Sequence, residues 1–177
     1  MNKRIFLFAI IFLSTFGCAR IDKLTQFEME YTESVTIESM IGINLPFNLF
    51  TPAISTNSES VFEINDTRKD RIEQIILTSL DLTLSIPDDG DFSFLKAIEI
   101  YISADGLDEL KIAWKEDIPS TVADYIELDT AGEDLKEYIV KDEFSLRVNT
   151  ITDKLISSNH QIDIHSIFFV DAEVLGQ

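Results

Sequence analysis

The chain has little of several residue types on which whole classes of protein depend. Its 177 residues include one cysteine, Cys18, and two histidines, and no serine stands in a Gly-x-Ser-x-Gly motif. A lone cysteine forms no intramolecular disulfide and no cysteine-based zinc site. Because a serine elbow and a second thiol are both missing, the sequence lacks the usual nucleophiles of triad catalysis. We therefore expect a protein that is not an enzyme.

Positive charge is also scarce. Lysine and arginine total 14, aspartate and glutamate total 32, and the formal net charge is -18 at pH 7. Cations dominate contacts with phosphates, so this balance argues against nucleic acid as a partner and against docking on an anionic membrane through a basic face. Solubility is the simplest reason for such an acidic surface. A basic partner protein and divalent cations are the functional alternatives.

Long apolar runs are confined to the start of the chain. Lys3 and Arg4 precede the run IFLFAIIFL, Ile5 to Leu13, and the small residue Gly17 follows it. This order of a basic start, a short apolar stretch and a small residue is typical of a secretory signal peptide. A transmembrane helix, which is the alternative, needs about 20 apolar residues. The run is shorter, so we predict a signal peptide over residues 1–17.

The segment TFGC, residues 15–18, resembles the lipobox of bacterial lipoproteins. Gly17 fits that pattern, whereas Thr15 stands where leucine is most usual and Phe16 is bulky for its place. Such loosened lipoboxes are similar to those of small Bacteroidota envelope lipoproteins of unknown function. The resemblance implies that the peptide bond before Cys18 is cut, that Cys18 is diacylated, and that the lipid holds the protein at the outer membrane.

The remainder of the chain fits one domain behind a short tether. Residues 18–25 hold the lipidated cysteine and the tether, and Ala19 to Thr25 spans at most ~25 Å when extended. Residues 26–177 have the length of one domain. Surface-exported lipoproteins of the group named above often carry an acidic cluster after the cysteine, whereas here only Asp22 is acidic. This favours the periplasmic face of the outer membrane, with the cell surface as the alternative.

Alternation of apolar and polar residues predicts many half-buried strands. Asp-Gly turns at residues 87–91 and 104–109 separate some of them, and a short helix is expected within residues 132–141. The fold class that follows is all-β, an antiparallel β-sandwich of about seven to nine strands with one short helix. The expected inward-facing residues are Phe27, Met29, Tyr31, Val35 and Ile37; Leu80, Leu82, Leu84 and Ile86; Ile98, Ile100 and Ile102; Leu110, Ile112 and Trp114; Phe144, Leu146 and Val148; and Ile162, Ile164, Phe168, Val170, Ala172 and Val174.

Acidic turns and an apolar segment are the candidate sites. Asp88, Asp89 and Asp91 crowd one turn and could supply oxygen ligands to calcium, although an ordinary solvated turn is the alternative. The segment Ile43 to Ile54 is apolar, and two prolines interrupt it. It is either an irregular edge strand packed on the core or an exposed loop that touches lipid or a partner. In the second case the contacting residues are Phe47, Leu49 and Phe50.

The histidines and the single tryptophan complete the set of candidates. His160 and His165 are five residues apart, so on a strand they point to opposite faces and cannot share a metal. Asp163 and His165 share the outward face and are expected to pair. Trp114 alternates with Leu110 and Ile112 and is expected in the core, which lowers the case for a sugar-binding protein.

Two functional hypotheses result from these patterns. The first is a non-enzymatic envelope lipoprotein that acts as an accessory or scaffold subunit of an outer-membrane complex, with the membrane and an envelope protein as partners. The second is a β-sandwich presented at the envelope that binds glycan or calcium. An exposed tryptophan or a carboxylate-lined cleft would favour the second, and a flat surface with an apolar edge patch would favour the first.

Overall fold

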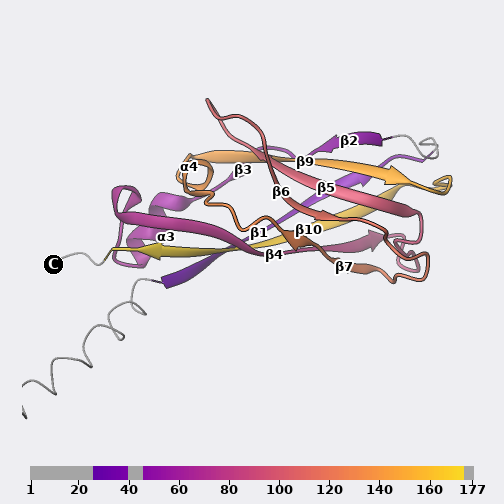
Figure 1. The fold of residues 1–177 in the computed structure, drawn as a ribbon, viewed down its shortest axis with the longest axis horizontal. Helices are drawn as coiled ribbons and strands as arrows, with labels where there is room; N and C mark the ends of the chain where they lie inside the picture. Colours follow the sequence, from indigo (N-terminus) through magenta and orange to yellow (C-terminus); the bar gives the residue numbers. More distant parts are fainter. Residues whose placement is uncertain (1–25, 40–45, 174–177) are drawn as a thin grey trace, which may run out of the picture.

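The computed structural model describes residues 26–39 and 46–173. The predicted signal peptide (1–17), Cys18 with its predicted lipid and the predicted tether (18–25), and Val174 lie outside these residues. Within them the chain forms ten β-strands in two stacked sheets, with all strand pairs antiparallel (Figure 1). The predicted antiparallel β-sandwich is confirmed.

The first sheet has four strands and the second has six. In spatial order the first sheet consists of β1 (Gln26–Ile37), β10 (His160–Ala172), β4 (Ile72–Ile86) and β7 (Tyr125–Glu127). The second consists of β2 (Pro46–Phe50), β9 (Glu143–Thr152), β5 (Leu95–Ser103), β6 (Leu110–Lys115) and β8 (Asp129–Thr130), with β3 (Ile54–Ser55) on β9 beyond β2. The helical elements are α3 (Ser58–Ile64), the 3-10 turn η2 (Lys69–Arg71) and α4 (Lys136–Ile139).

The strand pairing is nested along the chain. β1 pairs with β10, β2 and β3 pair with β9, β4 pairs with β7, and β5 pairs with β6. The first strand therefore pairs with the last and the innermost strands pair with each other, which is the winding of a jelly roll. The chain passes from β7 in the first sheet to β8 in the second through Leu128 alone, so the sandwich is closed along this side.

The largest fully buried side chains of the core are phenylalanines. Phe62, Phe92, Phe144 and Phe168 are fully buried. Tyr31 packs edge-on against Phe144 and Phe168, with ring centroids 5.3 and 5.7 Å away. Its hydroxyl donates a hydrogen bond to a backbone carbonyl in the segment that follows β3, at 2.8 Å, so Tyr31 ties the two sheets together on the side opposite Leu128. Burial raises the pKa of Tyr31.

Bulges in β4 change which residues face the core. Leu77 and Leu80 are both buried although they are an odd number of positions, three, apart, because the pairing with β10 shifts by one residue and Thr78 is left over. Leu80, Leu82 and Leu84 point inward as expected. The prediction for Ile86 was wrong: a second shift leaves Ser85 unpaired, and Ile86 is 49 % exposed.

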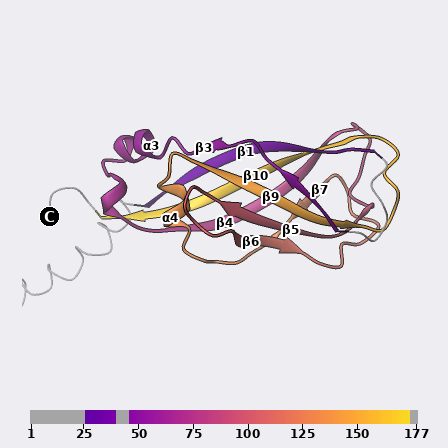
Figure 2. The same ribbon diagram turned by 90° about the horizontal axis from the view of Figure 1, so that it is seen from above.

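The helices differ from the prediction. The helix expected within residues 132–141 is present as the single turn α4. The sequence patterns did not reveal α3, whose Phe62 packs edge-on against Phe27 of β1 with ring centroids 6.1 Å apart. Figure 2 shows α3 beside the start of β1, at one end of the sandwich. Across residues 26–39 and 46–173, none of the helices has the length and apolar character needed to span a membrane.

Candidate binding face

Trp114 lies on the outer face of the second sheet, which corrects its predicted place in the core. Ile100 of β5 pairs with Ala113, but the next residue, Tyr101, pairs with Lys111, so Ile112 is an extra residue. Ile112 and Ala113 are consequently both buried, at 1 % and 0 % exposure. After this bulge the alternation is inverted, and Trp114 stands opposite the outward-facing Glu99.

Strand register arranges the outward side chains in two rows that cross the strands. Residues in one row are about 4.8 Å apart, and the rows are about 6.8 Å apart, as the pleated geometry requires. Paired residues lie on the same face, so the composition of each row follows from the pairing. The tyrosine row is Phe50, Arg147, Tyr101 and Lys111, and the tryptophan row is Asn48, Asn149, Glu99, Trp114 and Asp129.

Arg147 organises the tyrosine row. Its guanidinium lies 4.0 Å from the centroid of the Tyr101 ring. It donates two parallel hydrogen bonds to the carboxylate of Glu109, at 2.7 and 2.6 Å, and a third to the side chain of Asn48 at 2.6 Å. The bonds from Arg147 hold the pKa of Glu109 below its usual range, and the same carboxylate raises the pKa of Arg147. The pair is therefore charged and fixed in direction.

Glu99 organises the tryptophan row. Its carboxylate accepts hydrogen bonds from the Tyr101 hydroxyl (2.9 Å), the Asn149 amide (3.0 Å) and the Lys111 ammonium (3.3 Å). Burial alone raises the pKa of Glu99, but the three hydrogen bonds outweigh it and leave the pKa lowered. Burial, followed by the bond to Glu99, raises the pKa of Tyr101. Lys111 also lies 5.3 Å from the centroid of the Trp114 ring.

A cavity of about 280 Å³ adjoins the tryptophan row. It shares Glu99 and Asn149 with that row, and Glu116 and Asp117 add two carboxylates from the loop after β6. The complete lining is Lys96, Ala97, Ile98, Glu99, Glu116, Asp117, Asn149 and Ile151. A half-buried indole, an ionised carboxylate and two amides thus stand beside a small cavity, which is a composition suited to binding a polar ligand that has an apolar face.

The three predicted contact residues of β2 are divided between the two faces of the sheet. Phe47 and Leu49 pair with inward-facing residues of β9 and pack, half-buried, against the core. Phe50 pairs with Arg147 on the outer face and is 69 % exposed. Of the three, Phe50 is therefore the one that lies open to a ligand or partner, at the end of the tyrosine row.

In the turn predicted to bind calcium, Asp88 to Asp91, the carboxylate of Asp91 has a partner other than a metal ion. The backbone N–H of Ser93 donates to the carboxylate of Asp91 at 2.9 Å, and hydrogen bonding from Ser93 lowers the pKa of Asp91. Asp89 and Asp91 line a cavity of about 300 Å³ together with Lys154 and His160. In the described ranges, 26–39 and 46–173, no group of three or more histidine or acidic side chains is placed to hold a metal ion. Asp88, Asp89 and Asp91 thus form an acidic turn to which the geometry assigns no ligand set.

The histidines lie in different surroundings. His160 packs against the ring of Phe94, with centroids 4.7 Å apart. His165 lies on the outer face of the first sheet, where one ring nitrogen is 3.1 Å from Asp81 and the other is 3.7 Å from Glu30. The expected pair of His165 with Asp163 is not formed, because Asp163 instead accepts a hydrogen bond from the Ser34 hydroxyl at 2.6 Å.

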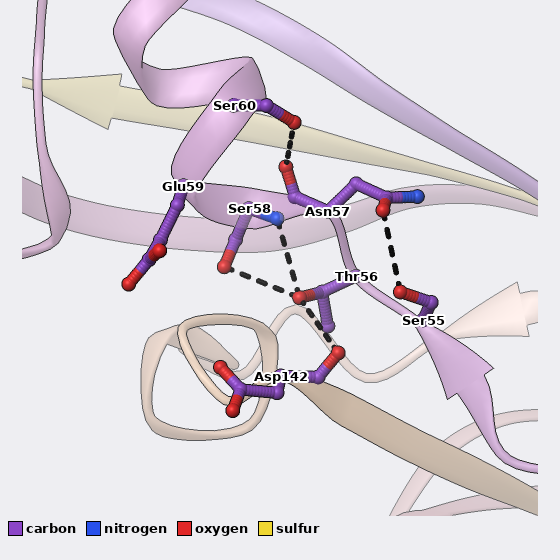
Figure 3. A pocket seen from close by; sticks show the side chains of 7 residues that line it. All are labelled: Ser55, Thr56, Asn57, Ser58, Glu59, Ser60 and Asp142. Atoms are coloured by element: carbon purple, nitrogen blue, oxygen red, sulfur yellow. Dashed lines mark hydrogen bonds between the residues drawn. The ribbon is translucent and has the colours of Figure 1, made fainter.

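Another cavity, of about 290 Å³, lies where β3 leads into α3 (Figure 3). Its centre is Thr56, whose hydroxyl donates to the backbone carbonyl of Lys141 at 2.6 Å and accepts from the backbone N–H of Ser58 at 3.3 Å. The backbone N–H of Thr56 also donates to the carbonyl of Asp142, at 3.0 Å. These bonds join the start of α3 to the start of β9, so the Thr56 side chain serves the fold.

Comparisons with known proteins give likenesses of fold only. No protein-family model matches the chain, and no curated protein matches it. Among solved structures it is similar to the capsid of Helicobacter pylori bacteriophage KHP30 (7% identity, 81% of this chain and 92% of that chain, TM-score 0.33). It is also similar to tomato aspermy virus (11%, 80% and 76%, TM-score 0.35) and to carbohydrate-binding modules of the β-sandwich superfamily (12%, 84% and 55%, TM-score 0.30). At these scores and identities the likenesses carry no argument about function.

Proposed function

We propose that the chain is a non-enzymatic binding module that binds a glycan on the outer face of its second sheet. The observation that carries this proposal is the position of Trp114. A bulge at Ile112 turns the single tryptophan of the chain away from the core and into a row of hydrogen-bonding side chains. Tryptophan in that setting offers an apolar ring beside polar partners.

The chemistry of the two rows suits a sugar. A sugar ring has C–H groups on its faces, which pack on an indole, and hydroxyl groups at its edge, which donate to carboxylates and accept from amides. Glu99 is ionised, and its neighbours Asn149 and Tyr101 hold it in position. Groups already fixed in position lose little conformational entropy when a ligand binds. The adjoining cavity would hold a side group of the bound ligand.

We propose further that a lipid on Cys18 presents this module at the outer membrane, on its periplasmic face. The support comes from the residues before the domain: the basic start, the short apolar run and the TFGC segment. The tether of seven residues, Ala19 to Thr25, would keep the domain within ~25 Å of the lipid.

The test uses the only tryptophan of the chain as its own reporter. Purified full-length chain is screened on an array of envelope and dietary polysaccharides, and each hit is titrated while Trp114 fluorescence is recorded. A bound sugar should change the emission of the native chain. Isothermal titration calorimetry, which needs no tryptophan, should show about 5- to 150-fold weaker binding to Trp114→Ala if a sugar stacked on the indole contributes as much as a stacked nucleic-acid base, on the order of 1–3 kcal/mol. Tyr125→Phe, on the first sheet, is the matched control. Hits whose affinity is the same for Trp114→Ala would refute a site at this face.

A second candidate function is an accessory subunit of an envelope complex, and Phe50 is the observation that favours it. This side chain is 69 % exposed on β2, at an edge of the second sheet. Crosslinking of the lipidated protein in its own envelope, compared between the native chain and Phe50→Ser, tests this function. One protein captured reproducibly by the native chain and lost with Phe50→Ser would favour the accessory role over glycan binding.

A further inference from the structure

The edges of the two sheets are of very different lengths. The first sheet ends in β1 on one side and β7 on the other, and the second ends in β2 with β3, and in β8. β7 has three residues, β8 and β3 have two each, and β2 has five and begins with Pro46. β1 has twelve residues and pairs with β10 throughout without a bulge. Figure 2 shows the two strands side by side. Short strands, prolines, bulges and charged side chains normally protect sheet edges from pairing with other chains; of these, β1 has only the charged side chains of Glu28, Glu30 and Glu33.

Half of the backbone groups of β1 point away from β10. The Tyr31 carbonyl accepts a hydrogen bond from the side chain of Ser166 on β10, and the N–H of Ser39, just after β1, donates to the side chain of Asn159, the residue before β10. Odd-numbered residues therefore direct their backbone groups toward β10, and alternation directs those of the even-numbered residues toward the open edge. In the described part of the chain, β1 has no other strand partner than β10. After Gln26, the residues that direct their backbone groups toward the open edge are Glu28, Glu30, Thr32, Ser34 and Thr36.

The charge of β1 indicates what can pair with it. The strand carries Glu28, Glu30 and Glu33 and contains no lysine or arginine. Glu28 and Glu30 are exposed on the outer face, whereas Glu33 points toward the inner face and is half-buried. A second copy of β1 would bring like charges together across the new pair, which is unfavourable. A strand with basic side chains would instead form opposite-charge pairs.

We propose that β1 is a docking site for an extended segment of a partner protein that carries lysine or arginine at alternate positions. The segment adds to the first sheet as a new edge strand and hydrogen-bonds to the even-numbered residues of β1. Its basic side chains lie on the outer face beside Glu28 and Glu30. This surface is separate from the glycan-binding face, which is on the other sheet.

The experiment titrates full-length chain with a synthetic peptide of about ten residues, close to the length of β1, in which lysine and valine alternate. A peptide with glutamate in place of lysine is the charge control. Binding is followed by fluorescence anisotropy of a labelled peptide, and amide hydrogen exchange is measured with and without it. We expect the lysine peptide to bind, the glutamate peptide to bind much more weakly, and the amides of the even-numbered residues Glu28, Glu30, Thr32, Ser34 and Thr36 to gain protection.

Variants at Thr32 separate strand addition from attraction by charge alone. Thr32→Pro removes an N–H at the open edge and should abolish binding, whereas Thr32→Val keeps it and should bind as the native chain does. Glu28→Gln with Glu30→Gln should weaken binding by about 2- to 30-fold. Absence of binding, equal binding of both peptides, or protection located away from β1 would each overturn the proposal. Failure of the glycan test leaves these outcomes unaffected, because Trp114 is not in the first sheet.

Discussion

Replacing Trp114 by alanine should cost much less stability than replacing Ile112 by alanine, although the two residues are close neighbours on β6. The bulge places them on opposite faces of the sheet. Ile112 is 1 % exposed and faces the core, whereas Trp114 is half-buried on the outer face. The pair of substitutions therefore tests the bulge itself, and with it the basis of the proposed binding face.

The expected magnitudes follow from these environments. For Trp114→Ala, partial burial of the indole contributes about 1 kcal/mol, and its cation–π contact with Lys111 adds about 0.5–1 kcal/mol. The total loss in the free energy of unfolding is about 1.5–2 kcal/mol. Ile112→Ala removes buried apolar volume and leaves a cavity, which costs about 2–5 kcal/mol. A tryptophan in the core would instead cost about 3–5 kcal/mol when replaced by alanine.

Urea unfolding followed by far-ultraviolet circular dichroism measures both losses, since the Trp114→Ala variant has no tryptophan fluorescence. The native chain and Lys111→Ala complete the series, and the latter should lose the cation–π contact, about 0.5–1 kcal/mol, together with the ion pair to Glu99, about 0–1 kcal/mol. A loss above about 3 kcal/mol for Trp114→Ala, equal to or larger than that of Ile112→Ala, would contradict the bulge at Ile112 and would show that the tryptophan is buried in the core.

Two further predictions concern the ion pair between Arg147 and Glu109 on the proposed binding face and the hydrogen bond from Tyr31 that links the two sheets. Because Arg147 lowers the pKa of Glu109, the pair stabilises the fold above the ordinary pKa of a carboxyl group and this contribution disappears as the pH falls through the lowered pKa. Glu109, 37 % exposed, is screened by solvent, so Glu109→Gln should cost about 0.5–1 kcal/mol at pH 7 and progressively less as the pH falls below the ordinary carboxyl pKa; a loss independent of pH in urea unfolding would contradict this. Tyr31→Phe removes the bond to Thr56 and should cost about 1–2 kcal/mol. The matched variant Tyr125→Phe, at an exposed hydroxyl, should shift the urea midpoint much less, and equal shifts would exclude Tyr31 as the tie between the sheets.

Regular strands were predictable from the sequence because their alternation is uninterrupted. In β5, β9 and β10 the expected inward residues within the described part of the chain, such as Ile100, Val148 and Phe168, are buried, and in β1 they are buried or, for Phe27 and Tyr31, half-buried against the core. β4 and β6 were only partly predictable. A bulge adds one residue to one strand and inverts the alternation after it, and nothing in the local composition of "LKIAWK" shows that Ile112 is the extra residue. The information lies in the partner strand, where Ile100 and Tyr101 fix the register.

The binding face was hidden from sequence analysis for the same reason. Its rows join five strands that are distant in sequence, so Asn48, Glu99 and Arg147 become neighbours only through strand pairing. One signal was present: outward polar residues at Glu99, Arg147 and Asn149 alternate with buried ones, and outward polar residues that gather on one sheet are candidates for a site. α3 was missed because its seven residues, SESVFEI, bury only Ser58 and Phe62, which is too short a pattern to recognise.

The jelly-roll winding relates the proposed anchor to the two proposed sites. Gln26, the first residue of β1, pairs with Asp171 near the end of β10, so the domain begins and ends at the same end of the sandwich, beside α3 (Figure 2). A lipid on Cys18 would therefore hold that end toward the bilayer, within ~25 Å. The strands run away from it, and β4 with its 15 residues is about 50 Å long. Because the tyrosine and tryptophan rows cross the strands, an upright domain would hold a bound glycan parallel to the membrane, while a segment added to β1 would run along the membrane normal. The two proposed ligands would thus be bound on different sheets and in different directions, and neither would block the other.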